Sequence, residues 1–238
     1  MAGTGTLVAI PVYNERDSVL GVLTRVRLAA PASVLVVDDG STDESGSTAS
    51  RLPGVEVLRH EVNEGYGKSL MDAFAYALEG DFDVLVTIDC DEQHEPALIP
   101  RFIELAGEHD IVSGTRYAPD SEVLGETPAD RAEINRTVTG RINDVTGYAL
   151  TDAFCGFKAY RRRALSRLRP TEWGYAMPLQ LWIQAARSRL DVIELPVPRI
   201  YHDADRSFGH DLDSKERRLE YYLRVIDDEL SGFRAVSS

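Results

Sequence analysis

The chain has 238 residues, 43% of them hydrophobic and 27% charged. This balance is typical of a globular domain with a sizeable core and excludes wholesale disorder. The formal net charge of −13 leaves no overall positive field of the kind that binds a nucleic-acid backbone, so we expect no nucleic-acid partner. The same charge disfavours passive adhesion to anionic lipid.

Cysteine usage and hydropathy predict the compartment. The chain has two cysteines, Cys90 and Cys155, and neither belongs to a CxxC pair. With no signal-peptide pattern at the N-terminus, this predicts a cytoplasmic protein. No apolar run approaches the roughly 20 residues of a membrane-spanning helix. A membrane substrate would therefore require peripheral contact at the inner face of the membrane.

Short apolar runs alternate with helical patterns through the first half of the chain. The runs are β-branched and bounded by polar turns, which predicts buried strands, and the stretches between them repeat apolar residues on one helical face. This order predicts an α/β fold with one doubly wound, mostly parallel sheet flanked by helices, a Rossmann-like form whose ligands lie beyond the carboxyl ends of the strands. The predicted strands are residues 7–10, 34–37, 55–58, 84–88 and 111–112, and the predicted helices include residues 19–26 and 70–78.

The pattern changes after Arg116. Residues 118–130 are rich in Pro, Gly and acidic residues, which predicts a loop. Residues 214–230 repeat apolar side chains at helical spacing, which predicts an amphipathic C-terminal helix docked on the domain, with a partner-binding helix as the alternative. The other predicted elements are a helix through Ile134, Val138 and Ile142, a helix over residues 176–190 and a strand over residues 192–197.

The sharpest chemical signal follows the predicted strand at residues 84–88. Asp89 and Asp91 are two residues apart, so at an extended strand end their carboxylates can converge on one cation. Hard divalent cations prefer such oxygen ligands, and Gln93 can add an amide oxygen. The cation would offset the repulsion between these carboxylates and a diphosphate, about 4 kcal/mol per pair of charges ~4 Å apart at an effective dielectric near 20. The alternative is a solvated acidic turn.

A second polar cluster, Pro-Val-Tyr-Asn-Glu at residues 11–15, follows the first predicted strand. Pro11 ends the strand ladder, and Tyr13 offers a flat face on which a base can stack. Glu15 can accept hydrogen bonds from a base or a ribose. The alternative is that residues 14–17 only cap the next helix.

Two further clusters suit a nucleotide. Residues 38–43, with Asp39 among them, follow the second strand, where carboxylates can bind ribose hydroxyls; a capping turn is the alternative. The glycines of residues 63–69 open a helix and place Lys68 where phosphates could bind, unless it is simply a solvated lysine. This segment is not a Walker loop, because Val62 stands where that pattern requires glycine.

In this order the clusters resemble the inverting family 2 glycosyltransferases of the GT-A fold, and they are most similar to the dolichol-phosphate mannose synthase group. That group carries the segments DADLQHPP, GSRY and DxxSGFR. Here they read Asp-Cys-Asp-Glu-Gln-His-Glu-Pro at residues 89–96, Gly-Thr-Arg-Tyr at 114–117 and Asp-Ala-Phe-Cys-Gly-Phe-Lys at 152–158. The resemblance implies a single GT-A domain over residues 1–238, with a nucleotide-sugar half at 1–116 and an acceptor half at 117–238.

The resemblance also implies the substrates and the roles of matching residues. The donor would be a GDP- or UDP-linked sugar, the cofactor Mg²⁺ or Mn²⁺ and the acceptor a polyprenyl phosphate. The chain departs from the group at Asn135 (Ser in the group), at Gln180 (Glu in the group) and in a stretched RxxGxSK pattern after Arg206. The implied metal ligands are Asp89, Asp91 and Gln93; the implied donor-binding residues are Pro11, Tyr13, Glu15, Val37, Asp39, Lys68, Asp89, Cys90 and Asp91; the implied acceptor-binding residues are Arg116, Arg131 and Arg206.

The candidate catalytic residues are Asp91, Arg116 and Asp152. The metal, with Lys68, would stabilise charge on the departing diphosphate. A phosphate acceptor is already anionic and needs positioning, for which the arginine fork is suited; the alternative for each arginine is a surface ion pair. A hydroxyl or glycan acceptor would need a base, and Asp152 is the candidate. A sugar-nucleotide-binding protein without turnover is the alternative of another class, against which the complete set of implied metal ligands argues.

Overall fold

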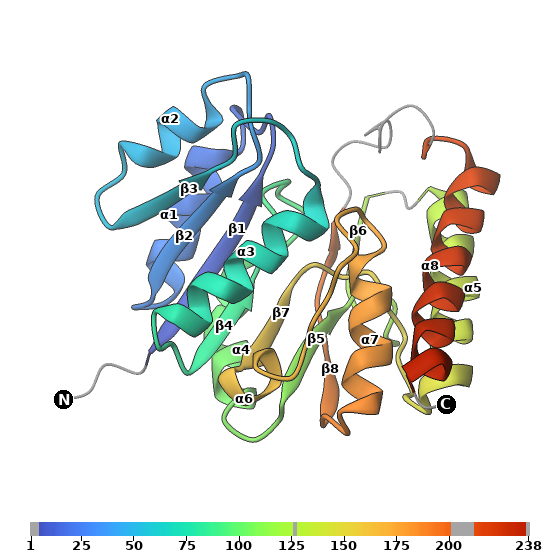
Figure 1. Ribbon diagram of the computed structural model, residues 1–238. Coiled ribbons are helices and arrows are strands. Elements are labelled where there is room, and N and C mark those ends of the chain that lie inside the picture. The colour runs from blue at the N-terminus through green and yellow to red at the C-terminus, as the bar shows by residue number, and fades with distance from the viewer. Residues whose placement is uncertain (1–4, 126–127, 201–211, 237–238) are drawn as a thin grey trace.

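The computed structural model describes residues 5–125, 128–200 and 212–236, and its centre is a seven-stranded sheet (Figure 1). The strand order is β3-β2-β1-β4-β7-β5-β8, and β7 runs antiparallel to both its neighbours while the other pairs are parallel. The predicted mostly parallel α/β sheet is confirmed. The strands are β1 (Thr6–Val12), β2 (Ser33–Asp38), β3 (Val55–Arg59), β4 (Val84–Thr87), β5 (Ile111–Thr115), β7 (Lys158–Arg161) and β8 (Val192–Pro196), and β6 (Val123–Leu124) pairs separately with β9 (Arg199–Ile200).

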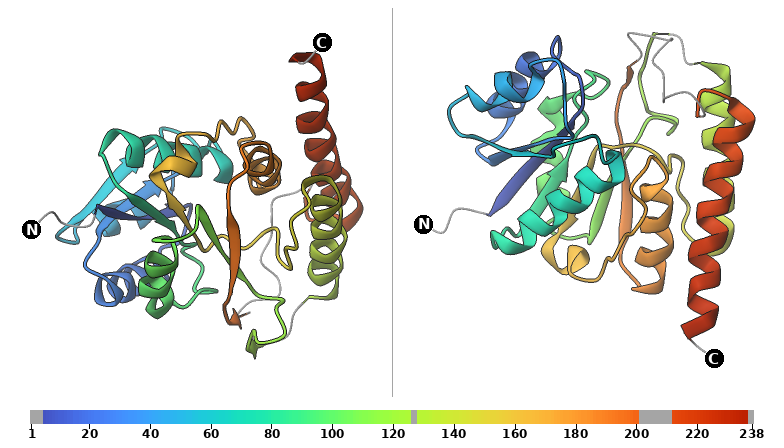
Figure 2. Two further views of the ribbon diagram at one scale, coloured as in Figure 1. Left: turned by 90° about the horizontal axis from the view of Figure 1, so that it is seen from below. Right: turned by 45° about the horizontal axis from the view of Figure 1, so that its top comes forward.

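Helices cover both faces of the sheet (Figure 2). Side chains alternate along β1, so that Leu7 and Ala9 join the hydrophobic cluster under α3 and α7, while Val8 and Ile10 join the cluster under α1 and α4. A strand buried on both faces reads as a continuous apolar run, which is why the sequence pattern predicts these strands well. The helices are α1 (Val19–Ala29), α2 (Ser45–Ser50), α3 (Tyr66–Glu79), α4 (Ile99–Leu105), α5 (Ala129–Thr146), α6 (Arg162–Leu165), α7 (Met177–Arg187) and α8 (Lys215–Val236), with a 3₁₀ turn η1 (Pro96–Leu98) before α4.

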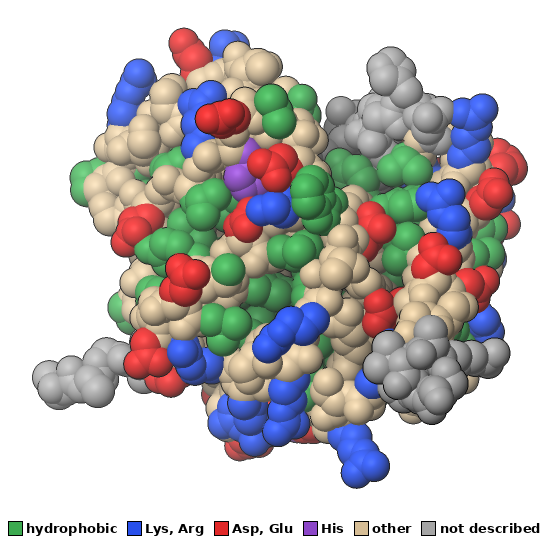
Figure 3. Space-filling model, in the orientation of Figure 1, with side chains coloured by type: hydrophobic (Ala, Val, Ile, Leu, Met, Phe, Trp, Pro, Cys, Tyr) green, Lys and Arg blue, Asp and Glu red, His purple; other side chains and the backbone are tan. Residues whose placement is uncertain are grey.

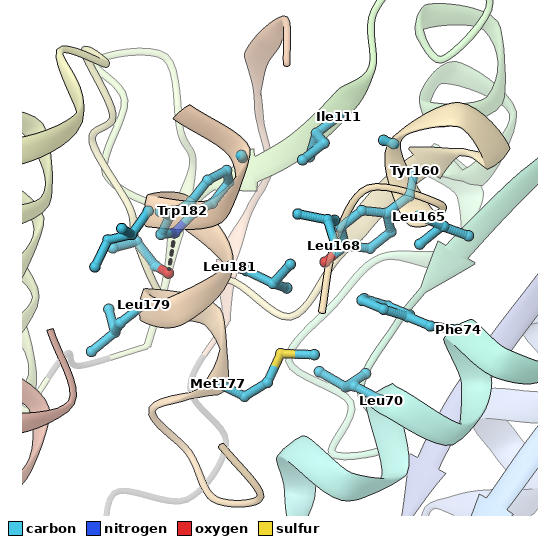
Figure 4. Packing of buried hydrophobic residues seen from close by; sticks show 14 of the residues in the cluster. Leu70, Phe74, Ile111, Tyr160, Leu165, Leu168, Met177, Leu179, Leu181 and Trp182 are labelled. Carbon is cyan, nitrogen blue, oxygen red and sulfur yellow. Dashed lines mark hydrogen bonds between the residues drawn. The ribbon is translucent and has the colours of Figure 1, made fainter. Parts of the chain in front are cut away.

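The larger cluster joins α3, α7 and β7, as Figure 4 shows. Phe74 of α3 meets Tyr160 of β7 edge to face, with ring centroids 5.0 Å apart. Trp182 of α7 is buried, and its indole N–H donates to the carbonyl of Ala153 at 2.9 Å. Loss of such a buried aromatic side chain typically costs about 3–5 kcal/mol. The core therefore fixes the backbone next to Asp152.

The C-terminal helix α8 packs against the domain. Tyr222, Val225 and Ile226 belong to the larger hydrophobic cluster, so the apolar face of the helix is covered by the rest of the chain. The buried guanidinium of Arg218 donates to Asp130 of α5, which ties the two helices together. Among the described residues, no helix combines the length and apolar character needed to cross a membrane.

Two segments differ from the sequence prediction. The strand β7 was not predicted, because it is only four residues long and its partners β4 and β5 come from distant parts of the chain. The stretch at residues 118–130 is not entirely loop: it contains β6, and α5 begins at Ala129. A two-residue strand leaves no periodicity to read, so only the folded partner β9 reveals it.

Candidate active site

The polar clusters identified in the sequence follow the carboxyl ends of β1, β2, β4 and β5, which meet at the upper edge of the sheet in Figure 1. Since β7 runs in the opposite direction, its first residue, Lys158, lies at this edge as well. Figure 3 shows acidic, basic and histidine side chains gathered close together near the start of α3, with hydrophobic side chains beside them. We call this region the carboxyl edge.

Asp89, directly after β4, has its carboxylate held from three sides. The hydroxyl of Tyr66 donates to Oδ1 at 2.9 Å, and Nε2 of His94 donates to Oδ2 at 3.1 Å. On the third side lies Gly156, where an added Cβ would come within 2.1 Å of Oδ2. The Asp89 side chain remains 26% exposed. The carboxylate is thus fixed in direction yet accessible at the edge.

The next residues alternate between the core and the carboxyl edge. Cys90 is buried in the cluster under α1, with Sγ 3.9 Å from the Ser18 hydroxyl. Asp91 is half-buried, and its Oδ1 accepts the backbone N–H of Gln93 at 3.1 Å. Cys90 is the residue expected against the donor, and its side chain is buried in this cluster.

The oxygen donors at this turn fit a divalent cation that arrives with its substrate. The described residues contain no group of three or more His, Cys, Asp or Glu side chains that could hold a metal ion. Mg²⁺ is commonly bound by one or two protein carboxylates together with substrate phosphates. Asp89, Asp91 and the amide oxygen of Gln93 match that kind of site. They do not match a cage built from protein ligands alone.

Asp39, at the carboxyl end of β2, binds the loop that leads into α3. Its Oδ1 accepts hydrogen bonds from Nδ1 of His60 at 2.7 Å and from the backbone N–H of Glu64 at 2.8 Å. Its Oδ2 accepts the N–H of Gly65 at 2.9 Å. Gly65 has φ +112°, a conformation that only glycine adopts readily. Asp39 therefore shapes the entrance to α3 as well as facing the predicted nucleoside site.

A chain of alternating charges runs from Asp39 to Lys68. His60 bridges two carboxylates, since its Nε2 lies 2.8 Å from Oδ2 of Asp72. Lys68 then donates to Asp72 at 2.6 Å. Burial by itself lowers the pKa of His60, but the hydrogen bonds and charges of Asp39 and Asp72 raise it, and the net shift is upward. The imidazolium form of His60 is thereby favoured.

The cluster at residues 11–15 lies beside β2. Pro11 does not end the strand ladder as predicted: it pairs in register with Val37, whose side chain is buried under α3, and β1 continues to Val12. Tyr13 is 47% exposed, as a ring that stacks on a base must be. The carboxylate of Glu15 accepts a hydrogen bond from the Ser18 hydroxyl at 3.0 Å. Ser18, directly before α1, makes no side-chain hydrogen bond that caps this helix, so the capping alternative gains no support from this contact.

Arg116 and Asp152 form a two-pronged ion pair. Nε of Arg116 donates to Oδ2 of Asp152 at 2.7 Å, and Nη2 donates to Oδ1 at 3.1 Å. Asp152 is fully buried, whereas the Arg116 side chain is 15% exposed. Burial alone raises the pKa of Asp152, but the charge and hydrogen bonds of Arg116 reverse this and leave the pKa below its ordinary value. Asp152 is therefore a charged partner for Arg116 and a weak base.

The structure describes one of the other two predicted acceptor arginines. Arg131 lies in the first turn of α5, where its N–H donates to the carbonyl of Pro128 at 3.1 Å. Arg206 lies outside the described residues.

Lys158 is a buried residue near the carboxylates of Asp152 and Asp89. Its ammonium donates to the carbonyl of Cys155 and lies 5.3 Å from the ring centroid of Trp182. Burial lowers the pKa of Lys158, while the charges of Asp152 and Asp89 oppose that shift. Its position in the segment at residues 152–158 was noted in the sequence, but its burial depends on the tertiary packing.

Sequence reasoning missed the residues that hold the predicted ligands in place. Tyr66 reaches Asp89, His60 reaches Asp39 and Asp72 reaches His60, each from another part of the chain, so no local pattern reveals them. His94 lies five residues after Asp89, within the segment at residues 89–96. Its place in that segment was the one feature of the sequence that could have indicated its contact with Asp89.

Comparison with known proteins identifies the family. The profile of glycosyl transferase family 2 matches residues 7–169. The undecaprenyl-phosphate mannosyltransferase of Micrococcus luteus is 32% identical over 209 residues, which cover 84% of this chain and 86% of that protein. The polyprenol monophosphomannose synthase of Mycolicibacterium smegmatis is 32% identical over 203 residues, covering 81% of this chain and 76% of that protein.

Solved structures show the same fold. Glucosyl-3-phosphoglycerate synthase from Mycobacterium tuberculosis, in complex with Mn²⁺, UDP-glucose and phosphoglyceric acid, superposes with a TM-score of 0.73 over 96% of this chain and 80% of that chain. At 21% identity this likeness concerns the fold alone. The chain is therefore a glycosyltransferase with the GT-A fold, and it belongs to glycosyl transferase family 2.

Proposed function

We propose that this glycosyltransferase transfers a hexose from a GDP- or UDP-linked sugar to a polyprenyl phosphate, with inversion and with Mg²⁺ or Mn²⁺ as cofactor. The observation that carries the proposal is the Arg116–Asp152 pair, which provides an oriented guanidinium at the carboxyl edge. The names of the two relatives described above support it: one is an undecaprenyl-phosphate mannosyltransferase, and the other is a polyprenol monophosphomannose synthase. A third, the undecaprenyl-phosphate 4-deoxy-4-formamido-L-arabinose transferase of an Enterobacter species, is 32% identical over 85% of this chain.

The donor would occupy the half of the carboxyl edge built from β1, β2 and β4. Tyr13 would stack on the base, and Asp39 and Glu15 would accept hydrogen bonds from the nucleoside. Asp89, Asp91 and Gln93 would hold the metal, which supplies charge stabilisation to the diphosphate when bound. Solved structures of glucosyl-3-phosphoglycerate synthase contain UDP with Mn²⁺ or Mg²⁺, which supports a divalent cation here.

The acceptor phosphate would bind on the other side, at Arg116. A guanidinium has five N–H donors in a planar fork, and Asp152 accepts two of them from the side chain. Because Asp152 fixes the plane of the fork, little conformational freedom is lost when the guanidinium binds a phosphate. Arg131 and Arg206 are the further candidates for this phosphate. Such a lipid lies in a membrane, so the protein would act peripherally at its cytoplasmic face.

A hydroxyl or glycan acceptor is the alternative, and it would need Asp152 as base. That carboxylate is fully buried, paired with Arg116 and lowered in pKa, three properties that disfavour proton abstraction near neutral pH. The site therefore supports an acceptor that is already anionic. A binding protein without turnover remains the alternative of another class.

Label transfer distinguishes these functions. The purified protein is incubated with radiolabelled GDP- and UDP-sugars, Mn²⁺ and either undecaprenyl phosphate or undecaprenol in detergent. We expect label in the organic phase only with the phosphate. Equal labelling of the neutral alcohol, or transfer to soluble glycans alone, would support the alternative function, transfer to a hydroxyl or glycan acceptor. Release of no sugar under any condition would support a silent binding protein.

A further inference from the structure

Tyr66, the first residue of α3, belongs to none of the roles assigned above. Its hydroxyl donates to Oδ1 of Asp89 at 2.9 Å, and its ring stacks on Tyr175 with centroids 5.7 Å apart and planes 18° from parallel. A carboxylate can only accept, so the phenol hydroxyl is the hydrogen-bond donor in this contact, which joins the start of α3 to the turn after β4.

We propose that Tyr66 is a positioning residue for the metal: its hydroxyl fixes the plane of the Asp89 carboxylate so that the carboxylate meets a metal–diphosphate complex already oriented. This inference rests on the proposed function, because Asp89 is one of the proposed metal ligands. Tyr66 itself would touch neither the metal nor the substrate.

An aspartate carboxylate needs such a group. Rotation about its last side-chain torsion is broad and only weakly restricted, so rotamer preference does not fix the plane of the two oxygens. Tyr66 holds Oδ1, His94 holds Oδ2, and the backbone at Gly156 closes one side. Removal of the tyrosine hydroxyl would take away the hydrogen bond to Oδ1 and leave the one from His94 to Oδ2 in place.

Tyr66 also links the two ends of the donor site. The residue before it, Gly65, donates its N–H to Asp39, so two consecutive residues bind the carboxylates that follow β2 and β4. The start of α3 thus fixes the positions of the two carboxylates relative to each other, the one proposed to bind the nucleoside and the one proposed to bind the metal. A diphosphate must bridge these two regions, since it joins the nucleoside to the sugar.

The chain offers a matched control for the loss of this hydroxyl. Tyr76 lies on the same helix, ten residues later, and its hydroxyl donates to the carboxylate of Glu56 on β3, away from the carboxyl edge. Tyr66→Phe and Tyr76→Phe therefore remove the same atom from the same kind of bond on one helix. Only Tyr66→Phe alters a proposed metal ligand.

The test is a titration of Mn²⁺, followed by electron paramagnetic resonance of the free ion, with UDP or GDP present. Loss of a residue that orients a metal ligand typically weakens metal binding about 10- to 100-fold. We expect a weakening of this size for Tyr66→Phe and a change within about twofold for Tyr76→Phe. Thermal unfolding curves of both variants identify a temperature at which each is fully folded. The titration is carried out at that temperature.

Asp91→Ala separates failure of this inference from failure of the proposed function. If Asp91→Ala loses Mn²⁺ binding and Tyr66→Phe binds Mn²⁺ as wild type does, the positioning role is wrong and the metal site stands. Equal weakening in Tyr66→Phe and Tyr76→Phe also refutes the role, because the effect would then be general to the helix. If Asp91→Ala binds Mn²⁺ normally, the metal site and the inference built on it are both wrong.

Discussion

Arg116 and Asp152 lie 36 residues apart in the sequence and bind each other through two side-chain hydrogen bonds, of 2.7 and 3.1 Å. The backbone N–H of Asp152 in turn donates to Glu194 of β8 at 3.0 Å. The guanidinium is thus anchored to two strands of the sheet through one buried carboxylate. A pair formed in this way makes Asp152 an orienting group for Arg116, and it links the guanidinium to the packing of β5 against β8.

Asp152→Asn tests this orienting role, because it keeps the shape of the side chain and removes its charge. We expect the KM for polyprenyl phosphate to rise about ten- to a hundredfold, which corresponds to a lost charge-assisted hydrogen bond of about 1.5–3 kcal/mol. Donor hydrolysis should stay near the wild-type rate, since the proposed nucleotide site is built from β1, β2 and β4. Steady-state kinetics with both reactions provide the measurement. A collapse of kcat on a hydroxyl acceptor would instead identify Asp152 as a base.

His60 gives the chain a predicted pH dependence of stability. Its pKa is raised above the ordinary value of 6.5, so the folded state favours the imidazolium between Asp39 and Asp72, with Lys68 and Glu64 also close by. The stabilisation is fully present below the unfolded-state pKa and is lost as pH rises through the folded-state pKa.

The measurement is thermal unfolding of wild type and His60→Gln. We expect the difference in Tm to be largest at about pH 6 and to shrink by about pH 9. A difference that is constant with pH would show that His60 contributes by packing alone.

Gly156→Ala should damage the site without any change to a charged residue. The added Cβ would fall 2.1 Å from Oδ2 of Asp89, so the carboxylate must move. We expect Mn²⁺-dependent turnover to fall at least about tenfold, in the range seen when a metal ligand is disturbed. Gly140→Ala on α5 is the control, since nothing lies within 4 Å of its added Cβ and alanine favours a helix by about 0.5–1 kcal/mol. Comparable losses in the two variants would refute the steric explanation.

Asp91→Ala should abolish turnover and weaken donor binding, because the diphosphate loses the carboxylate that anchors its counter-ion. Asp89→Asn should be milder toward the fold, since the amide keeps the shape of the side chain, although its nitrogen can no longer accept one of the two hydrogen bonds that Tyr66 and His94 donate. Isothermal titration of the donor with Mn²⁺, alongside turnover assays, measures both effects. Mn²⁺-dependent turnover at the wild-type rate in Asp91→Ala would remove the metal assignment.

The sheet could be predicted because its inner strands β1, β2, β4 and β5 are mostly buried on both faces, and such strands appear in the sequence as short apolar runs. The position of the site followed from the same pattern, since the clusters at Pro11, Asp39, Asp89 and Arg116 each follow a strand. The strand β7 could not be predicted: four residues between β4 and β5 carry no period of their own.

Side-chain contacts were the part that sequence could not supply. Cys90 lies between two aspartates and was expected beside the donor, yet its thiol packs under α1 because alternation at the strand end turns it into the core. Asp152 looked equally suited to act as a base until its bond to Arg116 was known. Tyr66 had no predicted role, since its contact with Asp89 spans 23 residues.

The most direct measurement is nuclear magnetic resonance of the product formed from undecaprenyl phosphate and the sugar donor that transfers label. We expect the anomeric carbon of the sugar to be bonded to the lipid phosphate, shown by coupling between the anomeric proton and phosphorus. We also expect the anomeric configuration to be opposite to that of the donor. A product with retained configuration, or with the sugar on any group other than the phosphate, would contradict inverting transfer to a polyprenyl phosphate.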